Sequence, residues 1–136
     1  MTRPVPAPPL LRDMVFVFGS NLAGRHGKGA ALYARQHFGA KTGVGEGLTG
    51  RAYAIPTKDA NLRTLPLDAI AESYARFIAV VHERPAWAFY LTPFGTGLAG
   101  HSLESIRSIV RGHPLPRNVF LAPDWVTARQ TAGDAA

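Results

Sequence analysis

Short apolar runs alternate with longer amphipathic stretches along most of this chain. The runs lie at residues 14–18, 51–55, 87–92 and 118–122, and a glycine or proline follows each of them. Apolar runs of this length, bounded by glycine and proline, predict buried strands. We therefore expect four strands, each ending where the chain turns.

Helical patterns occupy the three intervals between these strands. One helix is expected to begin near Gly29 and to end at Gly39, and another to begin at Ser102, a favourable N-cap residue. The middle helix has the clearest apolar face and is bounded by Pro66 and Pro85. Its apolar residues recur every three or four positions: Leu67, Ile70, Tyr74, Phe77, Ile78 and Val81.

This alternation of strands and helices is typical of an α/β domain with helices on both faces of the sheet. We expect one domain at residues 14–126, a proline-rich arm at 1–13 and a flexible tail at 127–136. In such sheets, ligands bind at the loops that leave the carboxyl ends of the strands. A functional site is therefore expected in those loops.

The composition excludes several kinds of chemistry. The 136 residues include no cysteine, which excludes disulfides, a thiol nucleophile and iron–sulfur ligation. The five histidines lack the spacing of metal ligands, so we expect neither a metal site nor a cofactor. No apolar run reaches the roughly 18 residues of a membrane span, and the proline-rich N-terminus is unlike a signal peptide. These features predict a soluble cytoplasmic protein with no membrane partner.

The chain is basic. It has 15 Lys and Arg against 9 Asp and Glu, which gives a formal net charge of +6. Such a charge suits a polyanionic partner, either nucleic acid or a phosphate-bearing small molecule. The arginines are scattered along the sequence, so charge alone does not choose between the two.

A glycine-rich segment, FGSNLAGRHGKGAA, leads from the first predicted strand into the first predicted helix. Glycines let a backbone approach an oxygen-rich ligand closely, and the N–H groups of a helix N-terminus bind anions. The segment is not a P-loop, because Lys28 is followed by Gly29 rather than by Ser or Thr. It is either a plain connector or an anion site. Its candidate ligand-binding residues are Gly19, Ser20, Asn21, Gly24, Arg25, His26, Gly27, Lys28, Gly29 and Ala30.

Two further segments follow predicted strands. YAIPTKD places Thr57 and Lys58 beyond a strand end, where Lys58 is either a surface residue or, in a cleft, an anion ligand or an amine nucleophile. LTPFGTGLAGHS is a second glycine loop between a strand and a helix. Its Phe94 either stacks on a base or sugar or packs in the core. The candidate residues of this loop are Phe94, Gly95, Thr96, Gly97, Leu98 and Ala99.

Together these segments resemble the macrodomain superfamily, and in particular a small macrodomain-like group of bacteria and phages. That group is similar to the branch containing the DNA ADP-ribosylglycohydrolase antitoxins and the terminal ADP-ribose protein glycohydrolases. The resemblance rests on the first glycine loop, on IPTK at 55–58 and on PFGTGL at 93–98, and it spans about Val15 to Leu121. It implies a three-layer α/β/α domain with a mixed central sheet.

The resemblance also implies a ligand of the ADP-ribose type. The loop matching Gly24–Ala30 would cradle the distal ribose and a phosphate, and the loop matching Phe94–Ala99 would wrap the diphosphate. Lys58 stands at the position of the glycohydrolases' catalytic lysine, which attacks the anomeric carbon of the ribose. The implied activity is hydrolysis of ADP-ribosyl linkages, with ADP-ribosylated nucleic acid as a candidate substrate.

This sequence departs from those relatives at two places. The proline-rich arm replaces their first strand, which carries an adenine-contacting acid, and Ala99 and Gly100 stand where the protein glycohydrolases have an aspartate. The second departure favours a site that uses the lysine alone. Two other interpretations stay open: a non-catalytic reader or sequestering module for an ADP-ribose signal, and a nucleic-acid-binding domain with structural glycine loops. A monomer and a homodimer both fit the sequence.

Overall fold

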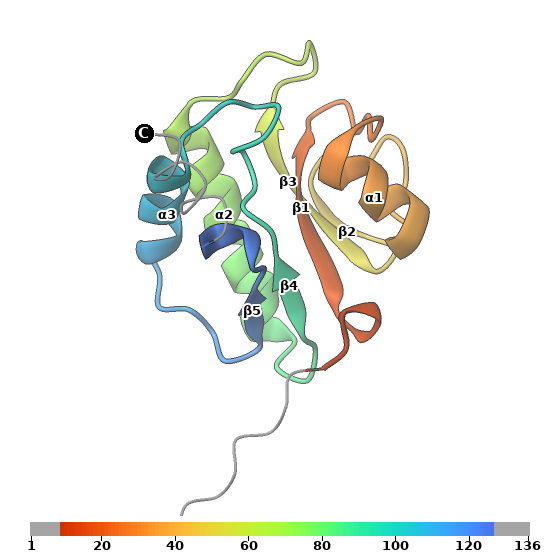
Figure 1. Cartoon of the computed structure of the whole chain (residues 1–136), viewed down its shortest axis with the longest axis vertical. Helices are drawn as coiled ribbons and strands as arrows, with labels where there is room; N and C mark the ends of the chain where they lie inside the picture. The colour runs from red at the N-terminus through yellow and green to blue at the C-terminus, as the bar shows by residue number, and fades with distance from the viewer. Residues whose placement is uncertain (1–8, 127–136) are drawn as a thin grey trace, which may run out of the picture.

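A computed structural model of the chain, which describes residues 9–126, has a five-stranded sheet with helices against both faces (Figure 1). The strand order is β2-β3-β1-β4-β5, and all pairs are parallel except the antiparallel pair of β2 and β3. The described residues therefore form a single α/β domain with a mixed sheet.

Strands and helices alternate along the chain, except that β2 and β3 follow one another directly. The strands are β1 (Val15–Asn21), β2 (Gly47–Thr49), β3 (Ala52–Lys58), β4 (Phe89–Leu91) and β5 (Val119–Leu121). The helices are the 3-10 turn η1 (Leu11–Asp13), α1 (Gly29–Phe38), α2 (Leu67–Glu83) and α3 (Leu103–Arg111). Within residues 9–126, none of these helices combines the length and the apolar character needed to cross a membrane.

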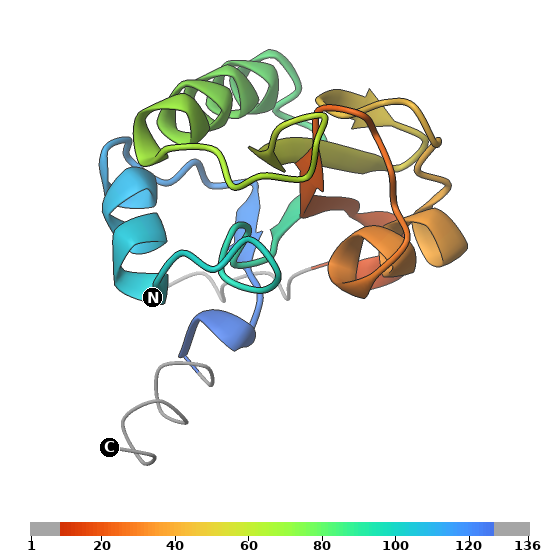
Figure 2. The same ribbon diagram turned by 90° about the horizontal axis from the view of Figure 1, so that it is seen from above.

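The central strand β1 contributes to two hydrophobic cores, because successive side chains of a strand point to opposite faces of the sheet. Val15 and Val17 belong to the core that α2 and α3 cover. Phe16 and Phe18 belong to a second core under α1. Figure 2 shows α2 and α1 on opposite sides of the sheet. Burial on both sides explains why β1 is an uninterrupted apolar run in the sequence.

The helix boundaries confirm the signals in the sequence. The predicted apolar face of α2 is buried except at Leu67, which is 38% exposed. At the start of α3, the Ser102 hydroxyl accepts a hydrogen bond from the Ser105 N–H at 3.1 Å. Gly39 ends α1 in the left-handed conformation with φ of 70°. Caps of this kind satisfy backbone groups that a helix end leaves unpaired.

Two strands extend further than the sequence pattern predicts. β1 continues beyond Phe18 through Asn21, so the first three residues assigned to the glycine loop belong to a strand. β3 continues through Pro56 to Lys58. Its neighbour β2 pairs only with residues 52–54, so the later part of β3 has no strand beside it on that side. Pro56 lies in this part of β3. Its missing N–H is tolerated there, because proline is acceptable where a strand forms the edge of a sheet.

Two elements have no clear signal in the sequence. β2 lies in a glycine-rich stretch and has a single apolar side chain, Leu48. The turn η1 packs Leu11 against the core under α1, so the folded unit begins before the predicted boundary at residue 14. The rest of the predicted arm, residues 1–8, and the predicted tail, residues 127–136, lie outside the described residues.

Candidate functional site

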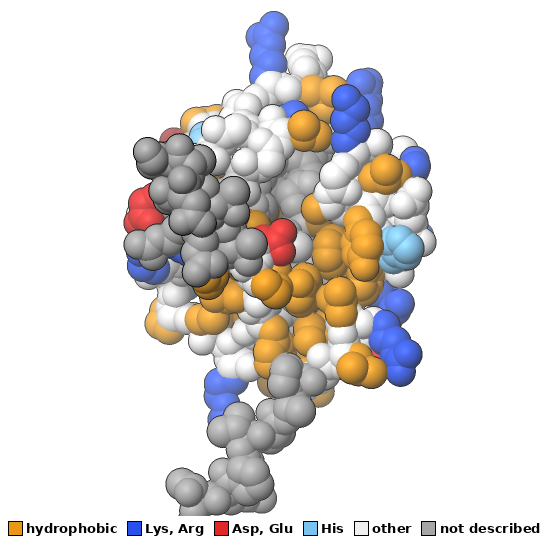
Figure 3. Space-filling view, in the orientation of Figure 1, with side chains coloured by type: hydrophobic (Ala, Val, Ile, Leu, Met, Phe, Trp, Pro, Cys, Tyr) orange, Lys and Arg blue, Asp and Glu red, His pale blue; other side chains and the backbone are white. Residues whose placement is uncertain are grey.

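The carboxyl ends of β1, β3 and β4 open into a cavity of about 1120 Å³. β1 lies between β3 and β4 in the sheet. After β1, the chain first forms β3 on one side of it and later forms β4 on the other side. Such a change of direction leaves a crevice at the strand ends, where ligands of α/β proteins bind. Figure 3 shows the hollow in this face, with hydrophobic side chains below it and Lys and Arg side chains above it.

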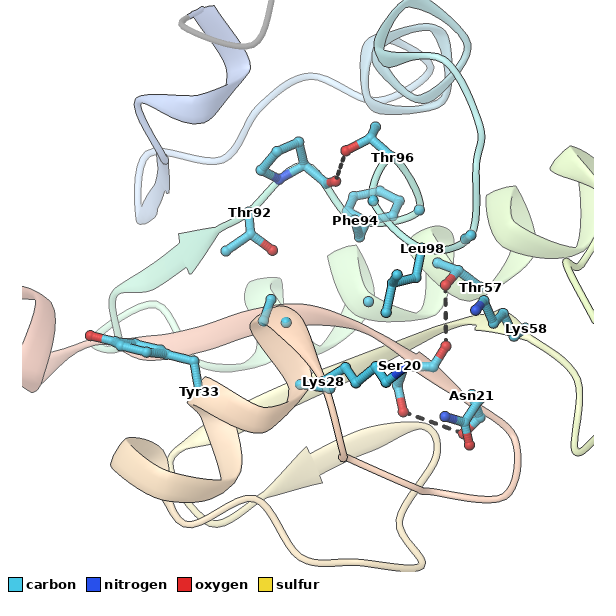
Figure 4. Close-up of a pocket in the computed structure, with 18 of the residues that line it drawn as sticks. Ser20, Asn21, Lys28, Tyr33, Thr57, Lys58, Thr92, Phe94, Thr96 and Leu98 are labelled. Carbon is cyan, nitrogen blue, oxygen red and sulfur yellow. Dashed lines mark hydrogen bonds between the residues drawn. The ribbon is translucent and has the colours of Figure 1, made fainter. Parts of the chain in front are cut away.

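The three segments singled out in the sequence meet around this cavity (Figure 4). The predicted site residues that line it are Gly19, Ser20, Asn21, Arg25, Gly27, Lys28, Gly29, Ala30, Thr57, Lys58, Phe94, Gly95, Thr96, Gly97, Leu98 and Ala99. Two predicted residues, Gly24 and His26, do not line it.

Gly24 has a structural role. Its φ is +69°, and a Cβ at this position would lie 2.4 Å from the Gly43 carbonyl carbon. Only a glycine therefore lets the first loop cross the segment that precedes β2. His26 is 2% exposed and lies beneath the same loop. Other parts of the chain cover both residues, so neither lines the cavity, and their contact with a ligand stays a prediction.

The first glycine loop borders the cavity and leads into the N-terminus of α1. Asn21 fixes the loop by two hydrogen bonds: its Nδ2 donates to the Arg25 carbonyl at 2.8 Å, and its Oδ1 accepts from the Arg25 N–H at 3.0 Å. Lys28 occupies the N-cap of α1, and its side chain makes no capping hydrogen bond. A Cβ at Gly27 or Gly29 would meet no atom within 4 Å. The N-terminus of α1 is thus open to an anion on its cavity side.

Lys58 comes from the last position of β3. It is half-buried, and its neighbour Thr57 donates a hydrogen bond from Oγ1 to the Ser20 carbonyl at 3.2 Å. Figure 4 shows Lys58 and Thr57 beside Ser20, with the Lys28 side chain reaching toward the same space. Among the described residues, Lys58 belongs to none of the ion pairs. Its ammonium or amine group is therefore available to a ligand.

The second glycine loop closes the opposite wall. Thr96 Oγ1 donates to the Pro93 carbonyl at 2.6 Å, which holds the turn. A Cβ on Gly19 would approach the Gly95 nitrogen to 3.2 Å, so β1 and this loop are in close contact. Gly97 has an ordinary φ, and a Cβ there would meet no atom within 4 Å. This combination makes Gly97 a suitable position to test whether a ligand occupies the space.

Phe94 packs in the core. It is 2% exposed, its ring stacks on Tyr74 at 5.5 Å, and it meets Trp125 edge-on at 6.2 Å. A ring enclosed in this way offers no face to a nucleobase. Of the two roles that the sequence left open, the structure therefore supports packing and excludes stacking on a ligand.

The cavity has an aromatic end that the sequence analysis did not predict. Phe16, Tyr33 and Tyr90 line this end, and Phe16 stacks on Tyr90 with 6.0 Å between ring centroids. Asp124 lines it too, and burial first and then the Asp124 charge raise the pKa of Tyr90. Asp124 follows the end of β5, so the rule that sites lie at carboxyl ends of strands could have found it. Tyr33 projects from α1 away from the glycine loops (Figure 4).

No cluster of three or more metal-binding side chains is found within residues 9–126. Comparison of the chain with family models, with curated proteins and with solved structures gives no match. The function therefore has to be argued from the cavity and from the sequence motifs around it.

Proposed function

We propose that this chain is a macrodomain-like protein that binds ADP-ribose or a related NAD-derived nucleotide and hydrolyses ADP-ribosyl linkages through Lys58. The observation that carries the proposal is one cavity that joins the two glycine loops, the N-terminus of α1 and Lys58. The placement of α1 on one face and of α2 and α3 on the other supports the α/β/α arrangement that the resemblance implies.

The two ends of the cavity match the two ends of ADP-ribose in chemistry. The loop N–H groups and the cations of Arg25 and Lys28 suit the diphosphate. The aromatic end, with Tyr33 and Tyr90, suits a nucleobase. The distal ribose would then lie beside Lys58. A volume of about 1120 Å³ exceeds the ~300–1,000 Å³ typical of small-molecule sites, as a dinucleotide-like ligand requires.

In the proposed reaction, the Lys58 nitrogen forms a bond to the anomeric carbon of the distal ribose. The bond from that carbon to the modified group breaks, and the departing atom takes up the proton that the Lys58 nitrogen loses. Water then adds to the anomeric carbon, and the bond to Lys58 breaks. The products are ADP-ribose, the unmodified partner and the free amine.

The alternative, a non-catalytic reader of the same ligand, is favoured by one observation. The acidic residue that lines the cavity within the described part of the chain is Asp124, at the aromatic end. Asp59, which follows Lys58, uses its Oδ1 to accept hydrogen bonds from the Asn61 and Arg63 N–H groups. No carboxylate of residues 9–126 is therefore placed on the cavity beside Lys58 as a general acid or base.

Gly97→Val is expected to weaken ADP-ribose binding at least ~10-fold, about 1.4 kcal/mol, because the new side chain would fill space that the ligand needs. Stability should change little, since φ is ordinary and nothing lies within 4 Å. Calorimetric titration and thermal unfolding measure the two effects. Ala86→Val, at an exposed position before β4, is the control and should bind normally. Unchanged affinity of a folded Gly97→Val protein would remove this loop from the site.

Asp124 is expected to select the base. Its carboxylate accepts a hydrogen bond from the exocyclic amine of adenine, whereas the carbonyl of hypoxanthine would repel it. The hypoxanthine analogue of ADP-ribose should therefore bind a few-fold more weakly, since Asp124 is exposed and water can replace part of the lost hydrogen bond. Asp124→Asn should reduce or reverse this preference, because an amide also donates. Equal affinities for the two ligands in wild type would contradict the assignment.

A further inference from the structure

A histidine–serine pair beneath the first glycine loop has no role in the function proposed above. His26 is 2% exposed, and its Nε2 lies 3.3 Å from Ser20 Oγ. The ring of Phe18 meets the imidazole edge-on at 5.2 Å. His26 Nδ1 has no hydrogen-bond partner within the described residues. Ser20, in contrast, lines the cavity. The imidazole is thus connected to the site through one hydroxyl group.

We propose that His26 is a positioning residue whose neutral imidazole holds the Ser20 hydroxyl and the loop of residues 22–28 in the ligand-binding arrangement, and that protonation of His26 releases both. The part that concerns ligand affinity rests on the proposed function. The part that concerns the loop stands on the geometry alone.

The surroundings of His26 disfavour an imidazolium. β1 contributes Phe18 and Ser20, α1 contributes the charge of Arg35, and the segment before β2 contributes the Val44 backbone. Burial and, less strongly, Arg35 lower the pKa of His26, while the Val44 backbone acts in the opposite direction. None of these groups is a carboxylate that would compensate a positive charge. A protonated ring would also carry two N–H donors, and in this structure Nδ1 has no partner that meets hydrogen-bond geometry among the described residues.

The loop is anchored just before His26, by the paired Asn21–Arg25 hydrogen bonds and by two backbone hydrogen bonds of Gly24. The Gly24 N–H donates to the Asn21 carbonyl at 2.9 Å, and the Gly43 N–H donates to the Gly24 carbonyl at 2.9 Å. His26 comes directly after these anchors and directly before Gly27, whose open side faces the cavity. An imidazole that moves out to water must therefore displace the N–H groups at the start of α1. Because His26 directly precedes these residues in the chain, its exposure to water would also disrupt the anion site at the start of α1.

The direction of the pH effect follows from the lowered pKa. We call the loop closed when His26 is buried and open when its imidazole is in water. In the open loop, the pKa of His26 is near its ordinary value of 6.5. In the closed loop it accepts a proton only at lower pH. The open form binds more protons, so the closed form is fully favoured above about 6.5 and loses ground as the pH falls toward the lowered value.

The experiment is calorimetric titration with ADP-ribose from about pH 7.5 to about pH 5, together with amide hydrogen exchange of residues 22–28. Wild-type affinity should fall about tenfold toward the acid end, because only the closed fraction binds. His26→Gln keeps a neutral polar group near Ser20 and should remove this pH dependence while binding within a few-fold of wild type at pH 7.5. His101→Gln is the control: His101 Nε2 contacts the Leu65 carbonyl at 2.9 Å, outside the first loop, and the wild-type pH profile should remain.

The outcomes separate this inference from the proposed function. If wild type binds no ADP-ribose at any pH, the proposed function fails, and hydrogen exchange alone decides the role of His26. Acid must then reduce protection of the 22–28 amides in wild type and leave it unchanged in His26→Gln. A wild-type pH profile in His26→Gln overturns the inference. If that variant does not fold, magnetic resonance titration of His26 in wild type decides: a ring that protonates while the loop stays protected also overturns it.

Discussion

Lys58→Ala is expected to abolish the release of ADP-ribose from a modified substrate while free ADP-ribose still binds. The rate should fall by several powers of ten, because alanine removes the amine that attacks the anomeric carbon. Binding should change by only ~1 kcal/mol, since the backbone amides of the two loops hold the phosphates and the lysine acts mainly in the transition state. ADP-ribosylated DNA is the first substrate to assay, and a modified protein the second.

Lys28→Ala is the matched control, because Lys28 lines the same cavity from the N-cap of α1. It should weaken binding and keep turnover at saturating substrate. The adduct of Lys58 with the anomeric carbon becomes an imine when the bond from that carbon to the ribose ring oxygen opens. Sodium borohydride added during turnover should reduce this imine to a stable amine and so trap wild type on Lys58. Tight binding without cleavage by wild type would favour the reader function. Equal cleavage by wild type and Lys58→Ala would exclude the lysine mechanism.

Gly24→Ala is expected to destabilise the domain by about 3 kcal/mol or more, while Gly27→Ala in the same loop leaves stability nearly unchanged. At Gly24 the φ is +69° and a Cβ would lie 2.4 Å from backbone atoms of Gly43, which cannot move aside as a side chain can. At Gly27 no atom lies within 4 Å and φ is ordinary. The same substitution should thus destabilise the domain strongly at one position and hardly at all at the other.

Denaturant-induced unfolding of the two variants measures this difference in stability. ADP-ribose titration of Gly27→Ala measures whether a side chain at this position weakens ligand binding. Gly27 is preferred to Gly29 for this comparison, because a φ of +57° at Gly29 would add backbone strain to any effect on the ligand. Equal stability of Gly24→Ala and wild type would mean that the first loop does not cross the Gly43 segment as described.

Much of the fold could be predicted from local patterns. The apolar run of β1 and the apolar face of α2 are strong signals, because nearly all of β1 is buried and one face of α2 is buried from Ile70 to Val81. The continuation of β3 through Pro56 could not be predicted, because it depends on where the neighbouring strand β2 ends. The turn η1 is similar: Leu11 is ordered by contacts with the core under α1 and not by its own sequence.

The glycine loops of the site could be predicted because they follow strands whose ends share one edge of the sheet. Local sequence patterns could not distinguish the loop residues that face the cavity from those that do not. Gly27 and Gly24 look alike in the sequence, and only the course of the Gly43 segment distinguishes them. Tyr33 and Asp124 reach the cavity from different elements, so their proximity required the three-dimensional arrangement.

The crossing of the first loop over Gly43, together with the paired hydrogen bonds between Asn21 and Arg25, has a consequence for the kinetics of binding. A loop tied at both places is preorganised, so a ligand arriving at neutral pH does not have to order it and loses less conformational entropy on binding. Association should then proceed in one step without a slow isomerisation. Substitutions in the cavity should change the dissociation rate constant far more than the association rate constant.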